Sequence, residues 1–236
     1  MNLEIGSVGY ADTDNGQDDE SCGTQVLPCQ TMQYAFEQVT VTIGQPLVLR
    51  IINSANITSN GLNAQSKQAD LIINSARDNQ ANLYVNKESD TLSTSIISVS
   101  KSLTLQNLEI DFEGVDHTHI FVHLTTKSSK LTLYSINVHN GQLNEHAFLV
   151  DEGVSIDVIN SRFDSIVSHG TGGSVIRVNL DTSSTATFTD SEFTDNVVEN
   201  GYQGGALLIN IKGDEIVDYS TIGTMEVISL KLISTN

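Results

Sequence analysis

Apolar and polar residues alternate in a short phrase that occurs five times along the chain. In each copy two apolar residues flank a polar one, a small polar residue follows two positions later, and a further apolar residue closes the phrase. The copies cover residues 103–110, 131–138, 156–163, 186–193 and 225–232. A period of two predicts a strand with one buried face. The small polar residue predicts a corner, because Asn and Asp tolerate left-handed backbone and bond their own backbone.

The predicted corner residues form one column. Its members are Asn53, Asn74, Asn107, Ser135, Asn160, Asp190 and Ser229. The first two come from a direct repeat, IINSAN at 51–56 and IINSAR at 72–77. Full copies start 28, 25, 30 and 39 residues apart, a spacing typical of solenoids, in which each unit buries its apolar face against its neighbours.

We therefore predict an all-β fold, a right-handed parallel β-helix of about seven or eight coils. The handedness follows the usual preference for right-handed crossovers. A leucine-rich repeat has a similar period and is the second interpretation. It ranks lower because its LxxLxLxxN pattern differs from the LxLxN found here.

A short helical pattern precedes the strands. Met32, Ala35, Phe36 and Val39 are spaced as one apolar helical face, and Thr31 suits the N-cap. We expect this helix to cover the first open end of the strand array. The expected organisation is an acidic N-terminal segment at 1–30, the capping helix and link at 31–45, and the β-helix at 46–236. Because the last copy has no polar cap, we expect the β-helix to continue beyond residue 236 or to be truncated there.

Charge narrows the range of partners. The chain has 236 residues and a formal net charge of -18, which repels the phosphates of nucleic acids and anionic membrane surfaces. No apolar run approaches the roughly 20 residues of a membrane-spanning helix, and no signal peptide is visible at the start. We expect no nucleic-acid partner, no membrane insertion by this segment and no cofactor.

Three local features near the N-terminus carry further predictions. Cys22 and Cys29 form a close pair that predicts a disulfide, with two free thiols as the alternative. Asn56 begins the one glycosylation sequon, Asn-Ile-Thr. The acidic stretch at 11–21 is similar to a calcium loop, but Gly16 occupies the place of a ligand. We therefore expect a solvated loop there.

Two motifs carry a family resemblance. FTDN at 193–196 followed by GGAL at 204–207 resembles the FxxN and GGA(I/L) repeat pair of chlamydial polymorphic membrane proteins. The preceding copy departs from that pattern, lacking the Asn and the Ala. SCGTQVLPCQTMQYAFEQV at 21–39 is similar to the opening of many pectin-lyase-like β-helix domains. The resemblance implies a parallel β-helix on a secreted or cell-surface protein, often a large adhesin or passenger domain.

The motif residues also have local interpretations. Phe193 is expected to fill the interior and Asn196 to bond backbone at the next turn, while Gly204 and Gly205 allow a tight corner. These roles are structural and nominate no catalytic residue.

Candidate chemistry is sparse in the sequence. Glycoside hydrolysis needs two facing carboxylates, and the outward column that aligns Thr132, Asp157, Thr187 and Glu226 holds no adjacent pair. His117 and His119, with His123, are expected on an exposed strand face. Their spacing makes the first two weak candidates for metal binding. We expect a non-catalytic structural or adhesive module that binds glycans or surface proteins. The alternative is a polysaccharide lyase or glycoside hydrolase.

Overall fold

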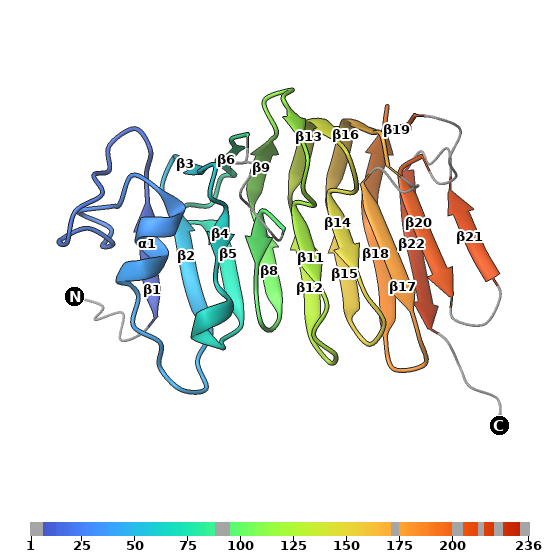
Figure 1. Cartoon of the computed structure of the whole chain (residues 1–236), viewed down its shortest axis with the longest axis horizontal. Coiled ribbons are helices and arrows are strands. Elements are labelled where there is room, and N and C mark those ends of the chain that lie inside the picture. The colour runs from blue at the N-terminus through green and yellow to red at the C-terminus, as the bar shows by residue number, and fades with distance from the viewer. Residues whose placement is uncertain are drawn as a thin grey trace.

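The structure, a computed structural model, is an all-β parallel solenoid of about five turns. It describes residues 7–87, 95–170, 175–199 and 205–211, with strands β21 (Glu215–Tyr219) and β22 (Thr224–Lys231). In Figure 1 the strands stand side by side from the N-terminal end to the C-terminal end. The predicted parallel solenoid is confirmed, and it has fewer turns than the seven corner residues indicate.

Three rows of parallel strands make the walls. The first row contains β1 (Val8–Ala11), β2 (Leu47–Ile51), β5 (Leu71–Ser75), β8 (Leu103–Gln106), β12 (Lys130–Tyr134), β15 (Ser155–Ile159) and β18 (Thr185–Thr194). The second contains β3 (Ser54–Ile57), β6 (Ala81–Val85), β9 (Leu108–Asp111), β13 (Asn137–Leu143) and β16 (Arg162–Ser168), and it ends on the second half of β18. The third contains β4 (Leu62–Asn63), β7 (Ile97–Ser98), β11 (Val122–Leu124), β14 (Phe148–Val150), β17 (Ile176–Leu180) and β20 (Leu207–Ile211).

Short elements complete the coils. They are the 3-10 turn η1 (Gln65–Lys67), β10 (Asp116–His117), which pairs with β13, and β19 (Val197–Val198), which pairs with β16.

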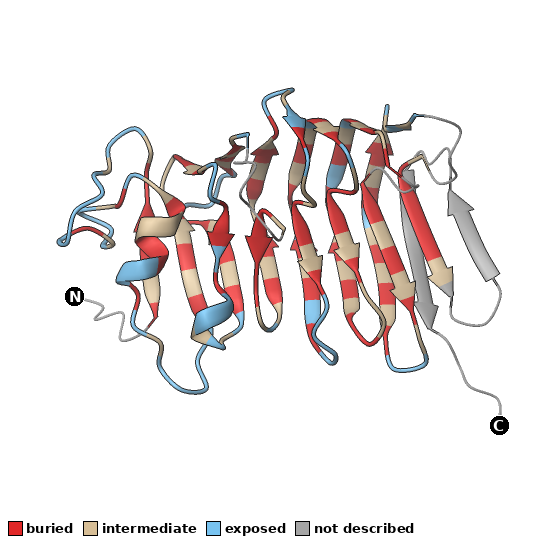
Figure 2. Ribbon diagram, in the orientation of Figure 1, coloured by how far each residue is buried: buried red, intermediate tan, exposed pale blue. Residues whose placement is uncertain are grey.

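The core is a stack of similar rungs, as Figure 2 shows by the alternation of buried and half-buried positions along the strands. Leu105, Leu133, Val158 and Phe188 lie directly above one another in register and are fully buried. A second column is aromatic. Phe112, Phe121 and Phe148 meet edge to face at 5.2 and 5.7 Å between ring centroids. Such contacts stabilise the stack beyond simple burial of area.

The predicted capping helix is confirmed as α1 (Met32–Gln38). The Thr31 hydroxyl accepts a hydrogen bond from the Tyr34 amide, as an N-cap should. At the other end the ammonium of Lys67 contacts the carbonyl oxygens of Phe36 and Val39. A cation at the C-terminal end of a helix interacts favourably with its last carbonyls, one of which, that of Phe36, also accepts from the Val39 amide.

Strand β1 lies within the segment expected to be only an acidic extension. It pairs in parallel with β2 and so adds a strand before α1. Gly9 interrupts its apolar alternation, which hid the strand from the sequence. A Cβ at Gly9 would lie 2.6 Å from Val39 Cγ2, so the glycine lets α1 pack closely on β1.

The C-terminal strands correct the prediction that the fifth copy of the phrase, at 225–232, forms another parallel coil. β22 runs antiparallel to β18, with Ser229 opposite Thr187, and β21 runs antiparallel to β20. Ser229 is therefore inside a strand and does not continue the corner column. An alternation with period two fixes which face is buried but carries no information on strand direction.

The predicted disulfide between Cys22 and Cys29 is present, and Cys29 is fully buried. Cys29 also exchanges backbone hydrogen bonds with Tyr10 and Asp12. The bridge therefore fixes the N-terminal loop against the first coil. Among the described residues, no helix has the length and apolar character needed to cross a membrane.

Candidate functional site

Four of the predicted corner residues line one edge of the solenoid. Asn107, Ser135, Asn160 and Asp190 all have left-handed backbone, with φ of 53, 52, 49 and 48°. The backbone amides of the first three each donate to a carbonyl in the next coil, over 3.0, 2.9 and 2.9 Å. This edge is a repeated structural turn, and its residues are occupied in holding coils together.

The two earliest corner residues lie elsewhere. Asn74 is within β5, opposite Gln106. Asn53 lies in the bend after β2, where its Nδ2 donates to Asp12 Oδ2 over 2.8 Å. The direct repeat aligns Ile51 with Ile72, but in the structure Ile51 pairs with Ser75. The alignment of Asn53 and Asn74 with the corner column is therefore wrong. Burial sets the register, because Leu47, Leu49 and Ile51 must face inward together.

The loop around Asp12 also differs from its prediction. Asp12 is buried, and besides Asn53 it accepts hydrogen bonds from Asn15 Nδ2 and the Asp14 amide. The acidic stretch is therefore in part a folded turn and not wholly a solvated loop.

A second column of left-handed residues was missed. Asn140, Ser165 and Asp195 have φ of 57, 55 and 52° and lie in neighbouring coils. Each follows a first-column corner by five residues. A small polar residue at that fixed offset was the available signal. This second bend shapes the outer surface beside β13, β16 and β18.

The repeat-motif residues are structural. Phe193 stacks on Phe163 with ring centroids 4.7 Å apart. Asn196 Oδ1 accepts from the Ile166 amide at 3.1 Å, and its Nδ2 donates to the Phe163 carbonyl at 3.0 Å. Gly204 lies outside the described residues. Gly205 is described and half-buried, beside buried Ala206.

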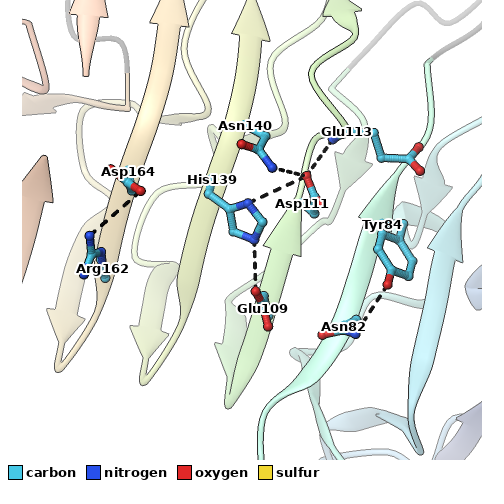
Figure 3. A network of polar contacts seen from close by, with 9 residues as sticks. All are labelled: Asn82, Tyr84, Glu109, Asp111, Glu113, His139, Asn140, Arg162 and Asp164. Carbon is cyan, nitrogen blue, oxygen red and sulfur yellow. Dashed lines mark hydrogen bonds and ion pairs between the residues drawn. The ribbon is translucent and has the colours of Figure 1, made fainter. Parts of the chain in front are cut away.

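The outward side of the second row of strands carries two columns of polar side chains, which we call the polar face. One column is Asn82, Glu109, Asn137, Arg162 and Glu192, and the other is Tyr84, Asp111, His139, Asp164 and Thr194. Figure 3 shows how most of these side chains lie. The repeated phrase specifies an outward polar position only on the strand before the corner, so the sequence pattern does not predict this surface.

His139 links two carboxylates of the preceding coil. Its Nε2 lies 3.2 Å from Glu109 Oε1, and its Nδ1 lies 3.8 Å from Asp111 Oδ1. Asp111 Oδ1 also accepts from Asn140 Nδ2 at 3.1 Å and from the Glu113 amide at 2.8 Å. The carboxylates are thus held in place by groups on the next coil and the following turn.

Arg162 performs the same role in the next coils. Its guanidinium lies 3.9 Å from Asp164 Oδ2 and 3.7 Å from Glu192 Oε2, and Thr194 donates to Asp164 at 3.1 Å. Arg162 therefore offsets part of the negative charge on the polar face.

Two hollows open on this face, and Asp111 borders both. A small one of about 80 Å³ is lined by Asn82, Tyr84, Glu109, Asp111 and His139. A larger, open one of about 530 Å³ is lined by Asp111, Glu113, Gly114, Asn140, Gln142, Ser165, Val167 and Asp195. The larger hollow thus offers three carboxylates, with no Lys or Arg among its described lining residues.

The histidines expected on one exposed face are separated. His117 is fully buried, edge-on to Phe112 with ring centroids 5.3 Å apart. His119 contacts the hydroxyl of Thr118 at 2.9 Å, and His123 contacts Asp151 at 3.0 Å. The expectation fails because His117 ends β10 and His123 belongs to β11, so they do not share one strand.

Metal ligands do not gather around these histidines in the described part of the chain. The one cluster there with suitable spacing is Asp18, Cys22 and Cys29, and its sulfurs are joined in the disulfide. Asn56, the predicted glycosylation position, lies half-buried on β3 opposite Tyr84. Its modification stays a prediction.

No protein-family model matches the chain, and no curated protein or solved structure matches it. The polar face therefore has to be interpreted from its own geometry.

Proposed function

We propose that the protein is a non-catalytic β-helix module of a secreted or cell-surface protein, which adheres to glycans through the polar face. The observation that carries this proposal is the fixed array around Asp111, whose carboxylate is held between two hollows by the Asn140 side-chain amide and the Glu113 backbone N–H, with His139 Nδ1 3.8 Å away. Preformed hydrogen-bonding groups on rigid strands lower the entropic cost of binding.

The chemistry of the hollows favours a neutral glycan. Tyr84 offers an aromatic surface, and the carboxylates of Glu109 and Asp111 can accept hydrogen bonds from sugar hydroxyls. Three carboxylates in the larger hollow and the net charge of -18 would repel a uronate or sulfated chain.

A secreted or surface location is part of the same proposal. A disulfide suits an oxidising compartment. The similarity of the FxxN and GGAL motifs to those of chlamydial polymorphic membrane proteins, and of the 21–39 segment to pectin-lyase-like domains, supports this location and an adhesive role.

A glycoside hydrolase is the second candidate. Glu109 and Asp111 both approach His139, and a pair of carboxylates on one surface is the minimum that hydrolysis requires. A polysaccharide lyase is less favoured, because such enzymes act on uronates, which the acidic hollows repel.

Binding to a panel of immobilised glycans tests the proposal. We expect neutral oligosaccharides to bind and uronate chains not to bind. Tyr84→Ala and Asp111→Asn should each weaken binding by about 10-fold, which corresponds to ~1.4 kcal/mol. Glu20→Gln removes an exposed carboxylate in the N-terminal loop and serves as the matched control. Equal binding by all variants, or a preference for uronates, would contradict the proposal.

A further inference from the structure

We propose that a groove on the first row of strands, away from the polar face, binds an acidic peptide segment that also carries an apolar side chain. The groove has a volume of about 620 Å³. The residues on its floor point outward from β5, β8 and β12 and are Ile72, Thr104 and Thr132. The proposal is independent of glycan binding at the polar face.

Two segments form the rims of this groove. One is the loop 41–46, which joins α1 to β2 and descends to the start of β2 in Figure 1. The other comprises η1 and the residues that follow it, 67–70, with Lys101, Ser102 and Lys130 where the next strands begin. The groove thus crosses neighbouring coils, which are about 4.8 Å apart.

The groove is positively charged on an acidic protein. Three of the chain's eleven Lys and Arg residues line it, namely Lys67, Lys101 and Lys130, against the single carboxylate of Asp70. Asp70 already accepts from the Ser102 amide at 3.2 Å. The electrostatic potential in this groove therefore favours an anionic ligand, whereas the net charge of -18 repels anions from the rest of the surface.

The three ammonium groups are not equivalent. Lys67 is directed to the carbonyl oxygens at the end of α1, and Lys130 contacts Asp157. Lys101 is exposed and has no partner among the described residues. It is the cation best placed to receive a carboxylate, with Lys130 able to share one.

An apolar rim completes the recognition surface. Ile43 is 98% exposed, and Val41 and Pro46 line the same groove. An isoleucine held wholly in water beside a charged groove is a surface that a partner's apolar side chain can cover. A ligand must then offer carboxylates and an apolar side chain close together. Acidic peptides have both, whereas acidic sugars lack a large apolar side chain.

The peptide would be held through its side chains. β5, β8 and β12 are each paired on both edges, so they cannot accept an added strand. Thr104, Thr132 and Ser102 supply hydroxyl groups along the floor to bond the peptide backbone.

Fluorescence anisotropy with a labelled peptide of alternating Glu and Leu tests the proposal. We expect the intact protein to bind it, with affinity falling as salt rises. Lys101→Gln and Ile43→Ser should each weaken binding several-fold. Both side chains are exposed, so neither change should disturb folding, which circular dichroism can verify.

Matched controls separate the groove from general surface effects. Lys127→Gln removes an exposed lysine that does not line the groove. Val26→Ser removes an exposed branched apolar side chain in the N-terminal loop, comparable with that of Ile43. Both should bind normally. Peptides of Gln and Leu, or of Glu and Ser, should bind weakly, because each lacks one of the two required features.

Three outcomes would overturn the proposal. They are an absence of binding at millimolar peptide, equal binding by the groove variants and the controls, and binding of a polyuronate in place of the peptide. Loss of glycan binding by the polar-face variants leaves this result unaffected, so the two proposals fail separately.

Discussion

Asn160 donates its side-chain amide to the hydroxyl of Ser135, one coil away, over 2.9 Å between Nδ2 and Oγ. Both residues have left-handed backbone, with φ of 49 and 52°. One contact therefore joins the turn conformation of two coils to the stacking between them.

Replacing Asn160 tests this joint role. Asn160→Ala should lower the free energy of unfolding by about 2 kcal/mol, since it loses a hydrogen bond and places alanine in left-handed backbone. Asn160→Gly loses the same hydrogen bond, but glycine adopts left-handed backbone without strain, so this variant should lose only ~1 kcal/mol. Urea denaturation measures both. Equal losses in the two variants would show that backbone conformation contributes nothing at this corner.

Asn196 should be among the polar residues most sensitive to substitution. Its amide bonds the Ile166 N–H and the Phe163 carbonyl of the preceding coil. Asn196→Ala leaves both backbone groups without that partner, so we expect a loss of about 2–4 kcal/mol. Asn60→Ala, at an exposed turn, should cost under ~0.5 kcal/mol. Similar unfolding midpoints for the two variants would argue against the Asn196 bridge.

Reduction of the Cys22–Cys29 bridge should destabilise the N-terminal end first. The chain-entropy estimate for so short a loop is about 2–3 kcal/mol. Because Cys29 is bonded to the backbone of Tyr10 and Asp12, hydrogen exchange after reduction should increase in β1 and α1 before it increases in β12 or β15. A uniform increase along the chain would contradict this.

The contribution of Asp181 to the free energy of unfolding should depend on pH. Hydrogen bonds from the Ser183 hydroxyl and amide, aided by Ser184, lower the pKa of the Asp181 carboxyl below its ordinary value of 3.8. A lowered folded-state pKa means that the stabilisation is present above 3.8 and is lost as pH falls through the folded-state value.

The test compares wild type with Asp181→Asn by thermal unfolding. The difference in stability should be less than about 1 kcal/mol, because the group is exposed and screened. It should be present at about pH 6 and shrink as the pH falls below 3.8. A difference that does not change with pH would exclude an ionic origin.

Much of the solenoid could be predicted because each coil is specified by a short sequence pattern that recurs along the chain. Leu103, Leu105 and Asn107 already define a strand with one buried face and a corner, and the spacing of the copies predicts stacking. Strand direction and register are set by contacts between distant segments. Those contacts placed Ser229 in an antiparallel strand and Asn74 one position before the corner.

The polar face was beyond sequence reasoning for a related reason. Glu109 and His139 are thirty residues apart and come together only when the strands after the corner are placed in register. The shared phrase specifies a single apolar position beyond the corner, so it does not predict which polar residues point outward together. The positively charged groove could not be predicted either, because its lysines come from three separate coils.

The fate of a bound glycan tests the central claim most directly. Each oligosaccharide that binds the purified protein can be incubated with it, recovered and examined by mass spectrometry and by measuring new chain ends. We predict that the glycan is recovered intact. We also predict that Asp111→Asn and Glu109→Gln reduce the amount of glycan that binds the protein. Cleavage by the wild type that disappears in Glu109→Gln, or the absence of any bound glycan, would contradict the proposed adhesive function.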